Sequence, residues 1–240
     1  MQARAVSFDF GQTLVELDEL LLTAKLRRMG VTVEPDRIVR ALDAAFAAYD
    51  RGFAAPSPHR PGEHAWKQFM QVLLTTAGAT PSRDLSTAID ALFADQPRAN
   101  LWQKPIAGMI ELMLELRAHG VPVGVLSNSE GRLVELARQL GWEKHFDTIV
   151  DSGVEGVEKP APEIFHRTAG RLGVATSELV HVGDSLSADV RGALSVGARA
   201  IWFSPEARAT TALETPQAIR TSTPAGVRAA LVSWGLLAAQ

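Results

Sequence analysis

The amino-acid sequence predicts an α/β fold in which a parallel sheet is interrupted, after its first strand, by a segment made only of helices. Short apolar runs alternate with helical patterns of about 10 to 15 residues along most of the chain, which is typical of βαβ units around a parallel sheet. Between residues 16 and 100 this alternation gives way to helical patterns alone. Together, the two observations predict a sheet core with a helical insertion.

The first strand is predicted at Ala5 and Val6, directly before the turn sequence Phe-Asp-Phe-Gly-Gln-Thr-Leu at residues 8–14. From about Glu16, apolar residues recur at helical spacing until Gly30 ends the pattern. Three further helical patterns follow, at residues 36–50, 63–77 and 82–94. Residues 16–100 are therefore expected to be all-helical.

Strands and helices alternate again after Pro105. The predicted order is helix 106–119, strand 121–126, helix 132–140, strand 146–150, helix 162–172, strand 179–182, helix 186–196 and strand 198–203. A looser stretch and then a helix at 225–237 close the chain. We expect a Rossmann-like core of residues 1–15 and 101–204, a helical cap of residues 16–100, and a C-terminal tail and helix, residues 205–240, packed on the core.

Composition restricts the functions that are open to this chain. Of its 240 residues 46% are apolar and 21% are charged, which indicates a globular protein rather than a disordered one. With a net charge of -3, the chain has no excess of basic residues that would indicate binding to nucleic acid or to a membrane surface. The absence of cysteine excludes disulfides, thiolate metal sites and a cysteine nucleophile. With no signal segment and no long apolar run, we expect a cytoplasmic protein, and its oligomeric state stays open.

Polar side chains follow four of the predicted strands. They are Asp9 after the first strand, Ser127 and Asn128 after the second, Lys159 in a turn after the third, and Asp184 with Asp189 after the fourth. Because the carboxyl ends of neighbouring parallel strands meet at one edge, where α/β sheets bind their ligands, we expect these side chains to lie together. Taken singly, each also suits a turn or helix cap, and Asp189 suits the first turn of a helix.

Carboxylates, a lysine, and small hydroxyl and amide donors suit a phosphoryl group held together with a hard divalent cation. Mg²⁺ prefers octahedral oxygen ligation by one or two carboxylates, with water and substrate phosphate completing the shell. An aspartate can attack phosphorus directly and form an aspartyl phosphate that water then hydrolyses. Lysine and metal would stabilise charge on the transferring oxygens. The predicted edge therefore has the parts for phosphoryl transfer.

These stretches, in this order, resemble the motifs of the haloacid dehalogenase (HAD) superfamily of hydrolases, subfamily with a helical cap inserted after the first strand. The resemblance spans residues 3 to about 204. It is carried by Asp9 with Thr13-Leu14, by Leu126-Ser127-Asn128, by Lys159-Pro160 with Pro162-Glu163-Ile164-Phe165, and by Val182-Gly183-Asp184-Ser185 with Asp189.

The resemblance implies a role for each of these residues. Asp9 would be the nucleophile, and Ser127, Asn128 and Lys159 would hold the substrate's phosphoryl oxygens. The metal ligands would be Asp9, Asp184, Asp189 and the backbone carbonyl of Gly11. The implied enzyme is a Mg²⁺-dependent phosphatase of a small phosphorylated molecule, with the cap closing over the site.

The sequence departs from the family pattern directly after the nucleophile. Family phosphatases usually carry a second aspartate at the position of Gly11, and glycine is usual at the position of Gln12. The missing aspartate is the usual general acid, whose work is worth about 10² to 10⁴ in rate. The enzyme could recruit another group or water, could use a leaving group that needs no proton, or could have lost catalysis.

Three alternatives to a phosphatase follow from this departure. A 2-haloacid dehalogenase also lacks an aspartate at this position, because halide leaves without a proton, but it works without a metal and its fourth motif differs. A catalytically weak HAD-fold protein would bind a phosphorylated ligand or a partner protein. A phosphonate hydrolase would need a Schiff-base lysine from the cap, for which Lys25 or Lys67 is nominated only by location.

Within the cap, His59, Arg60 and His64 are further candidates for substrate contact, although such residues are more commonly exposed surface residues.

Overall fold

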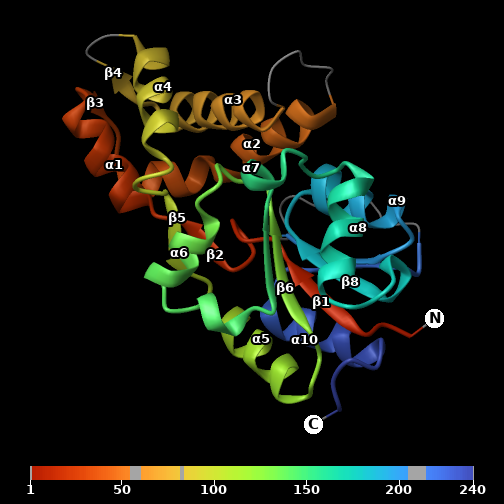
Figure 1. Cartoon of the computed structure of the whole chain (residues 1–240). Coiled ribbons are helices and arrows are strands. Elements are labelled where there is room, and N and C mark those ends of the chain that lie inside the picture. Colours follow the sequence, from red (N-terminus) through yellow and green to blue (C-terminus); the bar gives the residue numbers. More distant parts are fainter. Residues whose placement is uncertain (1, 55–60, 82–83, 205–214, 240) are drawn as a thin grey trace. The chain divides into compact units, whose positions relative to one another are not determined.

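The computed structural model describes residues 2–54, 61–81, 84–204 and 215–239, and His59 and Arg60 lie outside them (Figure 1). The chain divides into two compact units. We call Met1–Glu16 with Lys104–Gln240 the sheet unit, and Leu17–Gln103 the helical unit. Within the described ranges, no helix is long and apolar enough to cross a membrane.

The sheet unit is built on six parallel strands in the order β10-β9-β8-β1-β6-β7. Their bounds are β1 Ala5–Phe8, β6 Val123–Ser127, β7 Thr148–Asp151, β8 Leu179–Gly183, β9 Arg199–Phe203 and β10 Ala218–Thr221. All residues of β1, β6 and β8 are buried, as expected for parallel strands that are covered on both faces. The predicted α/β class with a parallel sheet is confirmed.

Helices cover this sheet. They are α5 Met109–Ala118, α6 Leu133–Gln139, α7 Ser152–Glu155, α8 Pro162–Arg171, α9 Gly192–Ser195 and α10 Pro224–Ser233, with short 3₁₀ turns at Glu143–His145 and Thr176–Glu178. Helices α8 and α9 pack together on one face of the sheet (Figure 1). There they bury Phe165 and Ala193 against Ala5 and Val150 of the sheet. Helices α5 and α10 form a second packed pair (Figure 1).

The sheet unit differs from the predicted elements at α7, which the sequence pattern does not predict, and in two further segments. The predicted helix 186–196 begins instead with a π-helical turn, Leu186–Arg191, before α9. The tail contributes the unpredicted strand β10, which pairs with β9, and α10 ends earlier than expected because Gly235 adopts a positive φ of 78°. The short and half-buried sequence of β10 lacks the apolar run that marks the central strands.

The helical unit contains α1 Glu19–Arg28, α2 Pro35–Ala54, α3 Pro61–Thr76 and α4 Leu85–Asp95, and a small antiparallel pair, β3 Val31–Thr32 with β4 Thr80–Pro81. Its helices close around their own apolar core, in which the Phe46 and Phe69 rings lie 4.8 Å apart. Asp18 caps α1 by accepting a hydrogen bond from the Leu21 amide. The expectation that residues 16–100 are all-helical is therefore wrong at β3 and β4, and at the start of the segment, where β2 includes Glu16 and Leu17.

Two strands carry the chain between the units. β2, Val15–Leu17, leads out of the turn that follows Asp9, and β5, Trp102–Pro105, leads back. The two pair as a sheet of their own. The insertion therefore leaves and rejoins the sheet unit through neighbouring strands.

Candidate active site

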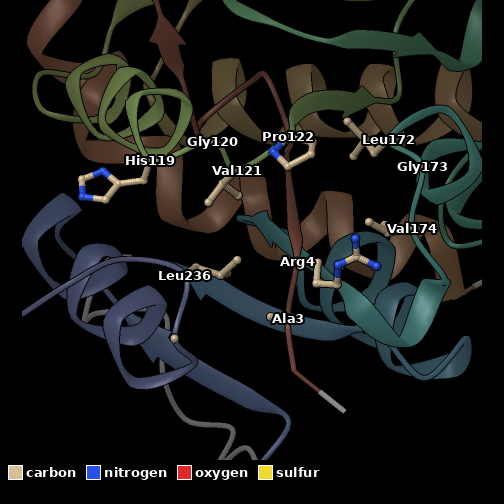
Figure 2. Close-up of a pocket in the computed structure, with 11 residues that line it drawn as sticks. Ala3, Arg4, His119, Gly120, Val121, Pro122, Leu172, Gly173, Val174 and Leu236 are labelled. Atoms are coloured by element: carbon tan, nitrogen blue, oxygen red, sulfur yellow. The ribbon is translucent and has the colours of Figure 1, made fainter.

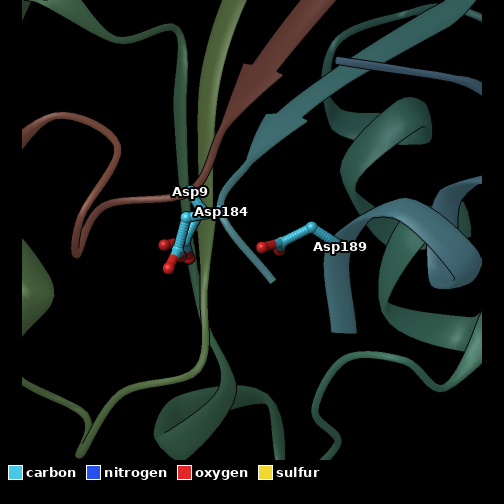
Figure 3. Close-up of side chains that lie close together, drawn as sticks. All are labelled: Asp9, Asp184 and Asp189. Carbon is cyan, nitrogen blue, oxygen red and sulfur yellow. The ribbon is translucent and has the colours of Figure 1, made fainter. Parts of the chain in front are cut away.

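Three carboxylates converge at the carboxyl edge of the central strands. Asp9 follows β1, Asp184 follows β8, and Asp189 lies in the π-helical turn (Figure 3). One oxygen of each carboxylate lies within 4.8 Å of the other two. Asp9 and Asp189 are buried, with exposed fractions of 8% and 2%, and Asp184 is half-buried. This concentration of negative charge needs compensating positive charge.

Lys159 supplies one positive charge from the turn after α7. Its Nζ donates hydrogen bonds to Asp9 Oδ1 and Asp189 Oδ1, both at 2.6 Å, and to the Leu126 carbonyl at 2.9 Å. Only 2% of Lys159 is exposed. The ammonium therefore joins two of the three carboxylates directly.

The pKa values of these buried groups shift in different directions. Burial opposes the charge on Lys159, but Asp189 and Asp9 raise the pKa of its ammonium. Burial also opposes ionisation of Asp189, but the Lys159 charge and the His181 hydrogen bond hold the pKa of that carboxyl below its usual range. For Asp9, burial and the Asp189 charge outweigh Lys159 and raise the pKa. The Asp9 carboxyl therefore ionises less readily than an ordinary aspartate, even beside the Lys159 ammonium.

The residues after β6 occupy the same edge. Ser127 ends the strand and is 5% exposed. The Asn128 amide is engaged by the backbone of Lys159: it donates to the Lys159 carbonyl at 3.0 Å and accepts from the Lys159 amide at 2.9 Å. Asn128 thus fixes the turn that presents the lysine.

The turn after Asp9 has an unusual backbone. Gln12 is a non-glycine residue at a φ of 56°, and its amide donates to the Val15 carbonyl at 2.6 Å, beside a bridge between Gly11 and Val15. Gln12 Nε2 and Thr13 Oγ1 are buried without a hydrogen-bond partner among the described residues. Left-handed backbone and unpaired buried polar atoms are features that often accompany a functional site, and here they lie in the turn after Asp9.

Asp151 fixes the loop after β6, and its position was not singled out by the sequence. Its carboxylate accepts hydrogen bonds from the amides of Gly131, Leu133 and Gly153 and from Ser129 Oγ, all between 2.9 and 3.0 Å. Asp151 ends β7 directly opposite Ser127. The rule that directs attention to polar residues at strand ends could therefore have identified it.

Glu130 lies in that loop. Burial, with a contribution from the Asp151 charge, raises the pKa of the Glu130 carboxyl to about 7. Nothing in the spacing of the sequence distinguishes Glu130 from a solvated loop residue, because its environment is created by tertiary packing.

Lys25 and Lys67 are paired within the helical unit. Lys25 Nζ donates to Asp95 Oδ2 at 2.8 Å and to the Ala99 carbonyl at 2.6 Å. Lys67 Nζ lies 2.9 Å from Glu63 and 2.8 Å from Asp90. The Asp90 and Glu63 carboxylates raise the pKa of the Lys67 ammonium, whereas a Schiff base requires a neutral amine.

A separate cavity of about 330 Å³ lies in the sheet unit (Figure 2). Its lining includes Arg4 before β1, the turns at Gly120 and Gly173 after α5 and α8, and Leu236. These residues flank the amino ends of the strands, whereas ligands of α/β sheets bind at the carboxyl ends. The cavity contains none of the site residues above.

Comparison with known proteins gives relatives along most of the chain. The Haloacid dehalogenase-like hydrolase domain-containing protein 3 of Mus musculus is 28% identical over 202 residues, covering 82% of this chain and 80% of that protein. The Glyceraldehyde 3-phosphate phosphatase of Methanopyrus kandleri is 30% identical over 202 residues, covering 81% of each chain. The Phosphoserine phosphatase of Thermus thermophilus is 30% identical over 171 residues, covering 68% of this chain and 63% of that protein.

Solved structures share the fold. The HAD-hydrolase YfnB of Bacillus subtilis, bound to magnesium, gives a TM-score of 0.70 at 17% identity, covering 96% of this chain and 99% of that one. A HAD family hydrolase of Deinococcus radiodurans, with bound phosphate and sodium, gives a TM-score of 0.65 at 24% identity, covering 100% of this chain and 99% of that one. A family model described as haloacid dehalogenase-like hydrolase matches residues 3–197. The chain therefore belongs to the haloacid dehalogenase-like hydrolases.

Proposed function

We propose that this hydrolase is a Mg²⁺-dependent phosphatase of a small phosphorylated molecule, and that it works through an aspartyl phosphate on Asp9. The observation that carries the proposal is the placement of Lys159 between Asp9 and Asp189 at 2.6 Å from each, in a cluster that also contains Asp184. This combination suits a phosphoryl group, whose oxygens need positive charge around the nucleophile.

The donor set fits a hard divalent cation. The site contains three carboxylates and one ammonium, which contacts two of them, and oxygen ligands of this kind are what Mg²⁺ prefers. Asp9, Asp184 and the Gly11 carbonyl would hold the ion, with Asp189 beside them. When bound, the ion would supply the missing positive charge, lower the pKa of Asp9 and polarise the phosphoryl oxygens.

The chain's own residues account for both chemical steps. A carboxylate oxygen of Asp9 bonds to phosphorus while the bond from phosphorus to the leaving oxygen breaks, and the leaving oxygen takes a proton from solvent. Water then attacks the same phosphorus and loses a proton, the bond to Asp9 breaks, and inorganic phosphate is released. Lys159 and Ser127 bind the transferring oxygens throughout, while Asn128 holds the Lys159 turn.

The absence of a carboxyl at Gly11 shapes the substrate range. Without an acid there, the leaving oxygen must depart with little help, so the rate should depend strongly on how acidic the leaving group is. The best substrates are therefore expected to be phosphates of acidic hydroxyls or of carboxylic acids. The helical unit would act as the cap that excludes water and selects among them.

The relatives support phosphoryl chemistry. Two relatives at 30% identity are named as phosphatases of small molecules. Two structures of the same fold contain magnesium in one case and phosphate in the other. Dehalogenation remains the second candidate because Gly11 also suits halide departure, but the cluster of Asp9, Asp184 and Asp189 is unnecessary for a metal-free reaction.

One experiment separates the candidates. Release of phosphate from an aryl phosphate is measured with and without Mg²⁺, alongside chloride release from a 2-haloacid in metal-free buffer. We expect Mg²⁺-dependent phosphate release that disappears in Asp9→Asn but persists in Asp36→Asn, an exposed aspartate of α2. Chloride release without metal would make the protein a dehalogenase. Silence in both assays would favour a binding protein.

A further inference from the structure

A buried serine and histidine lie beneath the carboxylates, outside the roles described so far. Ser7 of β1 and His181 of β8 are direct neighbours in the parallel pairing of these strands. They are 0% and 1% exposed. The Phe165 ring packs edge-to-face against the imidazole of His181, with the two ring centroids 5.4 Å apart. Solvent therefore does not satisfy either polar side chain.

The two residues form a continuous chain of hydrogen bonds to the site. Ser7 Oγ lies 2.9 Å from His181 Nδ1, and His181 Nε2 lies 3.0 Å from Asp189 Oδ1. An ionised carboxylate only accepts, so Nε2 must carry the hydrogen that it donates to Asp189. Nδ1, when it carries no hydrogen, accepts the Ser7 hydroxyl hydrogen. Ser7 thereby selects the tautomer that points an N–H group at Asp189.

Asp189 needs such support because its own backbone is irregular. It lies in the π-helical turn Leu186–Arg191, and its Oδ2 accepts the Ser185 amide at 2.9 Å. Its carboxyl group is pressed onto the end of β8, where a Cβ on Gly183 would lie 2.2 Å from Asp189 Cγ. Glycine at 183 makes the approach possible, and hydrogen bonds from both sides determine where the carboxylate stays.

Lys159 depends on the position of Asp189. The ammonium is held by Asp189, by the Leu126 carbonyl and by Asp9. If Asp189 moved, Lys159 would lose one of these three partners and could follow it away from Asp9. Displacements of about 1 Å in such a group can lower a rate by about 10².

We propose that His181, oriented by Ser7, is a positioning residue that fixes Asp189 and through it keeps the Lys159 ammonium against Asp9. The inference rests on the proposed phosphatase function for its kinetic consequence. Its structural content, the tautomer and the hydrogen-bonded chain, stands independently of the substrate.

The kinetic test compares three variants with the parent on an aryl phosphate. His181→Leu removes both hydrogen bonds and should lower kcat by about 10 to 100 times with KM changed less than threefold. His181→Gln can still donate from its amide to Asp189 and should recover at least a third of parental kcat. Thr168→Val removes a buried hydroxyl that donates within α8, to the Ile164 carbonyl, and should leave kcat unchanged. A kcat for folded His181→Leu within threefold of the parent overturns the proposal.

A second measurement needs no activity and no change at His181. Ring ¹⁵N chemical shifts of the histidines should show His181 as the Nε2–H tautomer in the parent, and Ser7→Ala should shift its Nδ1 resonance. An Nδ1–H tautomer in the parent overturns the proposal. If the parent hydrolyses no phosphate ester while His181 is Nε2–H, the phosphatase function fails and the hydrogen-bonded chain stands.

Discussion

Lys159 Nζ lies 2.6 Å from Asp9 Oδ1, although the two residues are 150 positions apart in the chain. The contact brings the turn after α7 to the end of β1, where the carboxylate that is proposed to attack phosphorus is kept next to a permanent positive charge. The same ammonium also bonds Asp189. Removal of this one amine therefore leaves two buried carboxylates facing each other.

Lys159→Met is expected to reduce both activity and stability. Loss of the ammonium should lower kcat by about 10² to 10³. It should also destabilise the fold by about 3 to 5 kcal/mol at neutral pH, because an uncompensated buried charge remains. Urea unfolding and steady-state kinetics check these values. Lys159→Arg keeps the charge and should lower the free energy of unfolding less than Lys159→Met does. Lys144→Met, at an exposed lysine, should change neither kcat nor the free energy of unfolding.

Gly11→Asp should restore the missing general acid. The positive φ of this turn belongs to Gln12 rather than Gly11, so a side chain at position 11 meets no left-handed backbone. We expect kcat/KM for an alkyl phosphate to rise by about 10² to 10⁴, with little change for an aryl phosphate, whose leaving group needs little protonation. Gly11→Asn controls for size and polarity. An equal gain in Asn and Asp variants would argue against acid catalysis.

Gln12→Gly should stabilise the protein by about 1 kcal/mol. Glycine adopts the φ of 56° without steric cost, whereas a left-handed non-glycine residue costs about 1 to 2 kcal/mol. The gain is reduced by the larger chain entropy of unfolded glycine. Gln12→Ala removes the unpaired amide but keeps Cβ, so denaturant unfolding of both variants separates the two effects. Unchanged stability in Gln12→Gly would show that the turn carries no strain.

Glu130→Gln should remove a pH dependence of stability. The carboxyl's pKa rises from 4.5 to about 7 on folding, so the folded chain binds more protons than the unfolded chain between these values. Glu130 should therefore lower the unfolding free energy as pH rises through this window, by about 3 kcal/mol at most. Compared with the parent, Glu130→Gln should be more stable at pH 8 and differ little below pH 4.5. The opposite ordering at pH 8 would contradict the burial that we describe.

The sequence predicts much of this edge because strand ends are readable from local patterns. Apolar runs before Asp9, Ser127 and Asp184 mark strands, and parallel pairing brings their carboxyl ends together. In the structure, Lys159 joins Asp9 as the turn pattern led us to expect. Asp151 also lies at a strand end, but its strand is short and an aspartate there also suits a helix cap, so the local pattern does not distinguish it.

Other features depend on information that a local pattern does not contain. The contact of Ser7 with His181 requires the register between strands 174 residues apart. The π-helical turn around Asp189 has the composition of an ordinary helix, so its altered geometry is not readable from the local sequence pattern. The left-handed φ of Gln12 runs against the preference of its side chain.

The pairing of β2 with β5 has a consequence for how this chain can diverge. Since the insertion departs and returns through adjacent strands, its length and sequence can change without shifting the register of the six-stranded sheet. Recombination that exchanges Leu17–Gln103 for another helical module would keep Asp9, Lys159 and Asp184 in their places. The architecture thus allows the substrate selection proposed for the helical unit to evolve separately from the bond-breaking chemistry proposed for the sheet unit.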